Sequence, residues 1–215
     1  MNKIRPNIEP FEQHYQKYEN WFEDNWAVYE SELRAVQAML PKTGTGIEIG
    51  VGTGRFAAPL GIQLGIEPSH KMNRIAQSRG IEVIGGVAEK LPFNNSQFDL
   101  VLSVTTICFL NNIEIAFQET RRVLKTGGSF IIGFVEKNSP VGKQYQKYKE
   151  ENVFYRVATF RSTQGIIPLL KRTGFGNLSF VQTIFHDLTE IKTIEPVKEG
   201  HGEGSFVVIR AEKID

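Results

Sequence analysis

The sequence predicts an α/β domain of three layers, built on a doubly wound, seven-stranded and mostly parallel sheet that closes with an antiparallel hairpin. Short apolar runs alternate with segments of helical periodicity along most of the chain, and the last two apolar runs have no helix between them. The 215 residues suffice for one such domain with a substantial core. At 40% hydrophobic and 23% charged residues, the composition is that of an ordinary globular protein.

The first part of the chain, residues 1–42, is predicted to be a helical segment that precedes the α/β domain of residues 43–215. Its aromatic residues Tyr15, Tyr18, Phe22 and Tyr29 recur near helical multiples, which indicates one or two amphipathic helices. Residues 41–46 break this pattern and separate the two parts.

The elements of the α/β domain follow from the apolar runs and their boundaries. Ser69 is a predicted helix N-cap, and Gly80 ends that helix. Residues 98–104 are apolar almost throughout, as expected of a strand buried on both faces. The predicted strands span 46–49, 63–67, 81–84, 98–104, 129–135, 178–185 and 205–211. The predicted helices span 55–60 (a very short one), 69–79, 113–124, 142–152 and 163–173, and residues 195–204 are predicted to form a loop.

The most informative segment follows the first strand and reads Glu48-Ile-Gly-Val-Gly-Thr-Gly54. Three glycines at alternate positions let the backbone turn sharply beside a flat, polar ligand, because no Cβ stands in the way. A second acid, Glu67, ends the second strand, where a carboxylate commonly accepts hydrogen bonds from ribose hydroxyls. The two acids predict a site for a nucleoside-containing cofactor at the carboxyl edge of the sheet.

With these residues in place, the chain resembles the class I S-adenosylmethionine-dependent methyltransferases of the small-molecule, methyltransferase-11-like type. The resemblance covers roughly residues 44–133 and continues more weakly to 211. Five motifs in the expected order carry it: Glu48 to Gly54, Glu67-Pro-Ser, Val87-Ala-Glu-Lys-Leu-Pro-Phe, Phe98-Asp-Leu-Val, and Arg122-Val-Leu-Lys-Thr-Gly-Gly. It implies a Rossmann-like methyltransferase fold, with the N-terminal helices as a lid, and S-adenosyl-L-methionine as the cofactor, which becomes S-adenosyl-L-homocysteine.

The resemblance also implies roles for individual residues. The glycine loop would approach the methionine part of the cofactor, Glu48 would support the loop and the amino group, and Glu67 would accept both ribose hydroxyls. Met72 would lie near the adenine, the main chain at Ala88 and Glu89 would contact the adenine edge, and Ser103 to Thr105 would face the sulfonium methyl. The implied cofactor-binding residues are Glu48, Gly50, Gly52, Gly54, Glu67, Pro68, Met72, Ala88, Glu89, Ser103 and Thr105.

No single catalytic residue can be assigned from the sequence. The methyl group of a sulfonium is already activated, so transfer needs mainly an aligned nucleophile in a dry pocket, and a general base is optional. Thr105, His186 and His201 are candidates on the acceptor side. For the two histidines, an ordinary surface position is the alternative.

Two aromatic groups are open to more than one interpretation. Tyr18 and Trp21 either close over the cofactor or pack in the core. A second group would line the acceptor pocket, and it consists of Tyr145, Tyr148, Tyr155, Arg156 and Arg161. For residues 143–151, a solvated helix face is the alternative.

Composition and net charge limit the kinds of binding partner that we expect for this protein. A net charge of +1 gives no basis for a nucleic-acid surface, and no apolar run approaches the length of a membrane span. Cys108 is the only cysteine, so we expect neither an internal disulfide nor a metal site. Residues 1–6 lack the apolar core of a signal peptide. We expect a cytoplasmic protein that acts on a small molecule; the oligomeric state stays open.

Two other functions fit part of the pattern. Glu67 would hold the ribose of NAD equally well, as in a nicotinamide-dependent oxidoreductase. A dinucleotide fingerprint, however, places its third glycine one position later, where Arg55 stands. The second alternative is a non-catalytic module that binds S-adenosylmethionine as a sensor or partner subunit.

Overall fold

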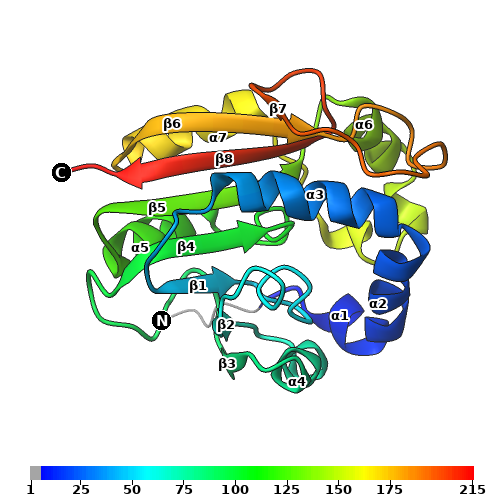
Figure 1. The fold of residues 1–215 in the computed structure, drawn as a ribbon. Coiled ribbons are helices and arrows are strands. Elements are labelled where there is room, and N and C mark those ends of the chain that lie inside the picture. The colour runs from blue at the N-terminus through cyan, green and yellow to red at the C-terminus, as the bar shows by residue number, and fades with distance from the viewer. Residues whose placement is uncertain (1–5) are drawn as a thin grey trace.

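The computed structural model describes residues 6–215 and shows a three-layer α/β architecture (Figure 1). Residues 1–5, which belong to the predicted N-terminal segment, lie outside the described residues. Within the described part, eight strands form one sheet in the order β3-β2-β1-β4-β5-β8-β6-β7. They are β1 (Gly46–Ile49), β2 (Leu64–Ile66), β3 (Glu82–Ile84), β4 (Phe98–Val104), β5 (Leu124–Val135), β6 (Phe175–Thr183), β7 (Lys198–Glu199) and β8 (Phe206–Lys213).

The first five strands run parallel, and β8 inserts antiparallel between β5 and β6. The chain reverses its strand order between β1 and β4, so the carboxyl ends of these two strands form the edge at which such sheets bind ligands. The mostly parallel sheet with a closing antiparallel pair confirms the predicted fold class.

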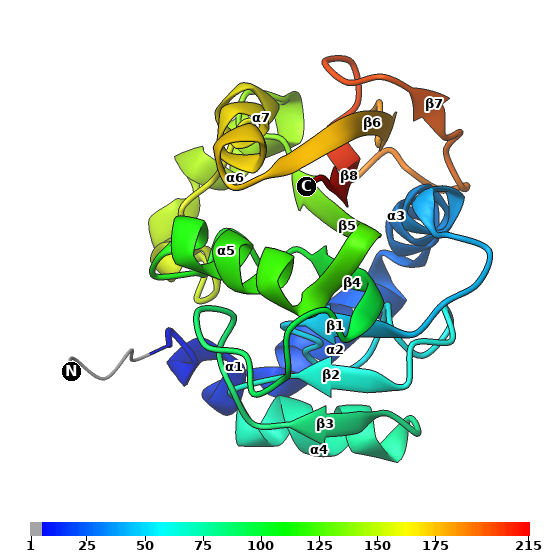
Figure 2. The ribbon, with the colours of Figure 1, turned by 90° about the vertical axis from the view of Figure 1, so that its left-hand side faces the viewer.

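Helices cover both faces of the sheet and its carboxyl edge. Helix α3 crosses one face, α5 and α7 lie against the other, and α1 and α2 lie beyond the carboxyl ends of the parallel strands (Figures 1 and 2). The helices are α1 (Glu9–Gln13), α2 (Tyr15–Asp24), α3 (Trp26–Met39), α4 (His70–Ser78), α5 (Ile113–Val123), α6 (Pro140–Lys147) and α7 (Thr163–Arg172), with short 3-10 helices η1 (Lys149–Glu151) and η2 (Tyr155–Val157). No helix among residues 6–215 is long and apolar enough to cross a membrane.

Helix boundaries follow the predicted capping chemistry. The Ser69 hydroxyl accepts a hydrogen bond from the Met72 amide (3.3 Å) and begins α4. Asn112 does the same for α5 through the amides of Glu114 and Ile115. Each cap satisfies amides that the first turn of a helix leaves without a partner.

The core has one cluster on each face of the sheet. On the α3 side, Ala35 and Val36 pack with Leu102 of β4. On the other side, Phe117 of α5 meets Phe130 of β5 edge to face, with ring centroids 5.1 Å apart. Strand β4 contributes to both clusters, which confirms the prediction that it is buried on both faces.

Three details of the predicted elements were wrong. Residues 55–60 form turns rather than a helix, because Pro59 has no amide hydrogen to donate to the Arg55 carbonyl; the Tyr29 hydroxyl donates to that carbonyl instead. Strand β5 begins at Leu124 rather than 129, since Leu124 pairs with Phe98. Strand β7 forms inside the predicted 195–204 loop by pairing with β6, which makes the strands eight rather than seven.

The α5–sheet packing predicts a large effect of one truncation. Phe117 is 1% exposed, and Phe117→Ala should lower the free energy of unfolding by about 3–5 kcal/mol, because it removes buried apolar surface and leaves a cavity. Urea denaturation followed by circular dichroism measures this. Ile115→Ala, on the same helix at 41% exposure, is the matched control and should cost less than about 1 kcal/mol. Equal losses in the two variants would contradict the packing described.

Candidate functional site

A cavity of about 340 Å³ lies at the carboxyl ends of β1, β2 and β4. Its floor comes from the glycine loop and the ends of these strands, and its walls come from residues 86–89 and 105–111. Its roof comes from the N-terminal helices together with residues 152–161. The volume falls within the range of about 300–1,000 Å³ that is usual for small-molecule sites.

The glycine loop turns directly after β1. Both Gly50 and Gly52 have positive φ (69° and 54°) and line the cavity. A Cβ at Gly50 would lie 2.4 Å from the Thr106 side chain, so a larger residue cannot fit there without displacement. The Thr106 hydroxyl donates to the Gly50 carbonyl (3.2 Å), which ties the end of β4 to this loop.

Glu67 lies beside the loop at the end of β2. Its Oε2 accepts from the Gly52 amide (2.9 Å) and its Oε1 from the Ser69 amide (2.8 Å). Burial raises the pKa of Glu67 to about 7 and outweighs these two hydrogen bonds. Each oxygen keeps a lone pair and the side chain lines the cavity, so the carboxylate can accept hydrogen bonds from a ligand.

Glu48 is buried beneath the loop rather than in the cavity wall. It is 2% exposed, and its Oε2 has no hydrogen-bond partner among residues 6–215. Burial raises its pKa well above the ordinary value, and the nearby Glu67 adds to the shift. The position suits the expected role of supporting the loop from below.

The side of the cavity next to Glu67 is built from α4 and from residues that follow β3. Met72, 1% exposed, lines the cavity together with Pro68 and Ala88. Glu89 also lines it, but its Oε1 accepts from the amides of Asn111 (2.9 Å) and Asn112 (3.1 Å) and so caps the start of α5.

The residues after β4 form the wall opposite. Thr105 adopts φ 50°, which is rare for a β-branched residue, and its amide donates to the Gly133 carbonyl (2.8 Å). Such strained positions cluster at functional sites. The Cys108 thiol donates to the Thr105 carbonyl (3.4 Å), and burial raises its pKa to about 12, so this thiol is not a nucleophile at neutral pH.

Aromatic side chains close the cavity from above. Phe11 meets Phe109 and Phe154 with ring centroids 5.0 and 5.3 Å apart, and Tyr18 meets Phe22 at 5.1 Å. All five line the cavity. A Cβ at Gly52 would lie 3.3 Å from the Tyr18 hydroxyl, so α2 rests directly over the glycine loop.

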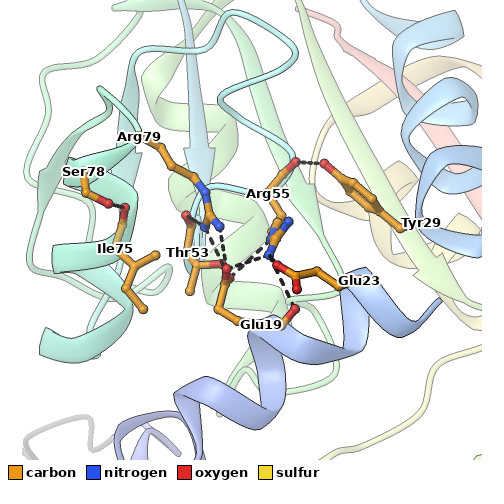
Figure 3. Close-up of polar contacts among 8 residues, drawn as sticks. All are labelled: Glu19, Glu23, Tyr29, Thr53, Arg55, Ile75, Ser78 and Arg79. Carbon is orange, nitrogen blue, oxygen red and sulfur yellow. Dashed lines mark hydrogen bonds and ion pairs between the residues drawn. The ribbon is translucent and has the colours of Figure 1, made fainter. Parts of the chain in front are cut away.

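An ion-pair cluster holds α2 in this position (Figure 3). Glu19 of α2 accepts from Arg55 Nη2 (2.7 Å) and from both terminal nitrogens of Arg79, and Arg79 also donates to the Thr53 carbonyl. Burial alone would raise the pKa of Glu19, but the hydrogen bonds from Arg79 and Arg55 outweigh it and lower the pKa. Helix α2 is thus fastened to the glycine loop and to the C-terminal end of α4 by charge-assisted hydrogen bonds.

The part of the cavity next to α3 and α6 is lined by a cluster of aromatic rings and by two charged side chains. Tyr145, Tyr155 and Phe160 bring their rings together there, and Arg161 lies nearby. Glu32 of α3, 6% exposed, also lines the cavity.

The structure brings most of the predicted site residues into one cavity. Those that line it are Gly50, Gly52, Glu67, Pro68, Met72, Ala88, Glu89 and Thr105, together with Tyr18, Trp21, Tyr145, Tyr155 and Arg161. Tyr148 is exposed instead, as expected of a solvated helix face, and Arg156 is exposed as well.

The remaining predicted residues lie outside the lining. His186 pairs at the surface with Glu195, which raises the pKa of the histidine, and His201 packs against the Phe180 ring (4.9 Å). Gly54 approaches the Ile81 side chain, and Ser103 lies within buried strand β4. Among residues 6–215, no group of three His, Cys, Asp or Glu could hold a metal ion.

Two contributors were not singled out from the sequence: Glu19 and Glu32. Only Glu32 leaves a sequence signal, because it falls inside the buried stripe of α3 at helical spacing from Val28 and Ala35. A single acidic residue within an apolar stripe indicates either that the helix is assigned wrongly or that the acid is buried. Glu19 depends on partners that lie 36 and 60 residues away in the chain.

Comparison with known proteins shows to which family the chain is related. A family model for a methyltransferase domain matches residues 47–132. A S-adenosylmethionine-dependent methyltransferase from Thermotoga maritima, described as a possible histamine N-methyltransferase, is 49% identical with a TM-score of 0.94, and the match covers 96% of this chain and 99% of that one. A protein of Methanocaldococcus jannaschii is 44% identical over 204 residues, 95% of this chain and 98% of its own.

A more distant structure shares the fold alone. A phosphoethanolamine N-methyltransferase from Haemonchus contortus, in complex with phosphomonomethylethanolamine and S-adenosylhomocysteine, aligns with a TM-score of 0.69 at 18% identity. The match covers the whole of this chain and 62% of that one.

The ion-pair cluster around Glu19 predicts that Glu19→Gln lowers the free energy of unfolding by about 2 kcal/mol, because two arginines lose their carboxylate partner. Thermal denaturation at pH 7.5 measures this. Since the pKa of Glu19 is lowered, the stabilisation is present above its ordinary pKa and is lost on acidification, so the deficit should shrink toward pH 3. Glu23→Gln, 75% exposed and 3.5 Å from Arg55, is the control and should change stability by less than about 0.5 kcal/mol. Equal deficits would refute the assignment of the fastening to Glu19.

Proposed function

We propose that this chain, which belongs to the S-adenosylmethionine-dependent methyltransferases with the class I fold, transfers a methyl group to a small-molecule acceptor. When bound, the cofactor supplies an activated methyl group for in-line displacement. The observation that carries the proposal is the Glu67 carboxylate, which lines the cavity beside the glycine loop.

The residues present fit the cofactor. Gly50 and Gly52 line the cavity with bare backbone, since a Cβ at Gly50 would strike Thr106 and one at Gly52 would press on Tyr18, and Glu67 keeps an accepting lone pair on each oxygen. In this arrangement Glu67 would accept from the ribose hydroxyls, and Met72 and Ala88 would border the adenine. The family membership favours this cofactor over the dinucleotide alternative.

Two observations support a small acceptor. The cavity is roofed by α1, α2 and residues 152–161, which leaves little access for a macromolecule. The Thermotoga maritima relative is described as a possible histamine N-methyltransferase, and histamine is a small molecule. The chain's part in catalysis is to exclude water and orient the acceptor, because the lining is dominated by aromatic and aliphatic side chains.

Transfer itself is tested with S-adenosylmethionine labelled in the methyl group and a cell extract as the acceptor source. We expect label in the small-molecule fraction, dependent on the protein. Label confined to protein or RNA would contradict the small acceptor, and binding of the cofactor without any transfer would favour the non-catalytic module.

The ribose assignment predicts that Glu67→Ala weakens binding of S-adenosylhomocysteine more than tenfold, about 1.4 kcal/mol or more, because the hydroxyl acceptors are lost. Isothermal titration calorimetry measures the affinity, with NADH as the competing ligand. The exposed Glu82→Ala in β3 is the control and should bind as the wild type does. Unchanged affinity in Glu67→Ala, or tighter binding of NADH than of S-adenosylhomocysteine by the wild type, would remove the assignment.

A further inference from the structure

Glu32 is a buried acid that the proposed cofactor site does not use. It lies in the middle of α3, within the stripe that packs on the sheet, next to Ser31 and one turn from Val28 and Ala35. Its side chain nevertheless reaches the cavity wall, on the side of Tyr145 rather than of Glu67. The position points the carboxylate at whatever occupies that half of the cavity.

The Glu32 carboxylate has no partner in the protein. No hydrogen bond or ion pair joins it to any of residues 6–215, whereas the carboxylates of Glu67 and Glu89 each accept two backbone amides. A buried carboxylate without a partner is costly, so its pKa rises, here to about 8 through burial. A protein keeps such a group most readily when a ligand supplies the partner.

The side chains around Glu32 are suited to a cation. The ring centroid of Tyr145 lies 4.3 Å from that of Tyr155 and 6.3 Å from that of Phe160, and all three line the cavity. Both tyrosines are close enough to Glu32 to feel its charge, which adds to the effect of burial in raising their pKa values. Aromatic faces attract a cation, and the attraction is stronger where water is excluded.

Building on the proposed methyl transfer to a small molecule, we propose that the acceptor carries an amino group, which binds as a cation between the Glu32 carboxylate and the rings of Tyr145 and Tyr155.

Two positively charged side chains line the same cavity: Lys17, which is exposed, and Arg161. Of these, Arg161 would favour an anionic acceptor in this half of the cavity. Its Nε is buried without a partner, but the side chain as a whole is only partly buried and so keeps contact with water. No ion pair links it to Glu32. Glu32, at 6% exposure, is the more deeply buried of the two and ionises at neutral pH only when a counter-charge is beside it, so the burial of the two residues favours an amine.

Binding of matched probes tests the proposal. Calorimetry at pH 7.5 on the wild-type protein saturated with S-adenosylhomocysteine compares phenethylamine, 2-phenylethanol and 3-phenylpropionate, and in parallel n-butylamine, 1-butanol and butyrate. We expect at least one amine to bind ten times more tightly than its alcohol and its acid. Equal affinities within both series, tightest binding of an acid, or no binding of either amine would overturn the proposal.

The amine affinities of two variants test whether Glu32 is the residue that binds the amino group. Glu32→Gln should lose at least tenfold in amine affinity while binding S-adenosylhomocysteine as the wild type does. Glu30→Gln, on the same helix but in a surface pair with Arg34, should bind the amine unchanged. Equal amine affinity in Glu32→Gln and the wild type would overturn the proposal.

A ligand-free readout checks the state of Glu32. Because its pKa is raised from 4.5 to about 8, the native state holds a proton that the unfolded chain releases, and the associated stability is lost as the pH rises toward 8. The melting temperature of the wild type should therefore fall by on the order of 5 °C more than that of Glu32→Gln between pH 6 and 9. The titratable groups that feel the charge of Glu32, Tyr145 and Tyr155, are the same in both proteins. Parallel pH profiles would overturn the proposal, because Glu32 would then not be an unpartnered buried acid.

The two proposals can fail separately. If S-adenosylhomocysteine does not bind the wild type, the cofactor site itself is refuted. If it binds and the amines show no preference, only the acceptor class is refuted.

Discussion

The ion-pair cluster around Glu19 is the interaction on which the rest of the site depends. One carboxylate from the N-terminal helices joins Arg55, directly after the glycine loop, and Arg79, directly after α4 (Figure 3). It thereby holds Tyr18 over Gly52 and closes the aromatic roof. Without this closure the glycine loop would be an open surface, and the cavity would be filled by bulk water.

Closure sets the electrostatics of the cavity. Excluding water raises the pKa values of the carboxyl groups of Glu32, Glu48 and Glu67, and the three differ in how the protein compensates for it. Glu67 receives two amides, Glu48 lies under the loop, and Glu32 has no partner among the described residues. The number of hydrogen-bond partners matches the proposed roles. Glu32, which has no partner, is the acid in the cavity wall that we assign to the acceptor.

Features encoded by neighbouring residues could be predicted from the sequence, and features that depend on distant partners could not. The glycine spacing and Glu67 are local signals, and both reach the cavity as expected. Arg55 was recognised only as the residue that replaces a dinucleotide glycine, because its partner Glu19 lies 36 residues away. The wrong prediction of a helix at 55–60 has the same cause. The Arg55 carbonyl accepts its hydrogen bond from the hydroxyl of Tyr29, which is distant in the sequence.

The most direct test of the account is a crystal structure of the protein with S-adenosylhomocysteine. The account predicts both ribose hydroxyls within about 3 Å of the Glu67 carboxylate. It also predicts Tyr18 closed over the ligand and the sulfur facing the part of the cavity that holds Glu32 and Tyr145. A ligand with its ribose away from Glu67, or with its sulfur facing away from that part of the cavity, would contradict it.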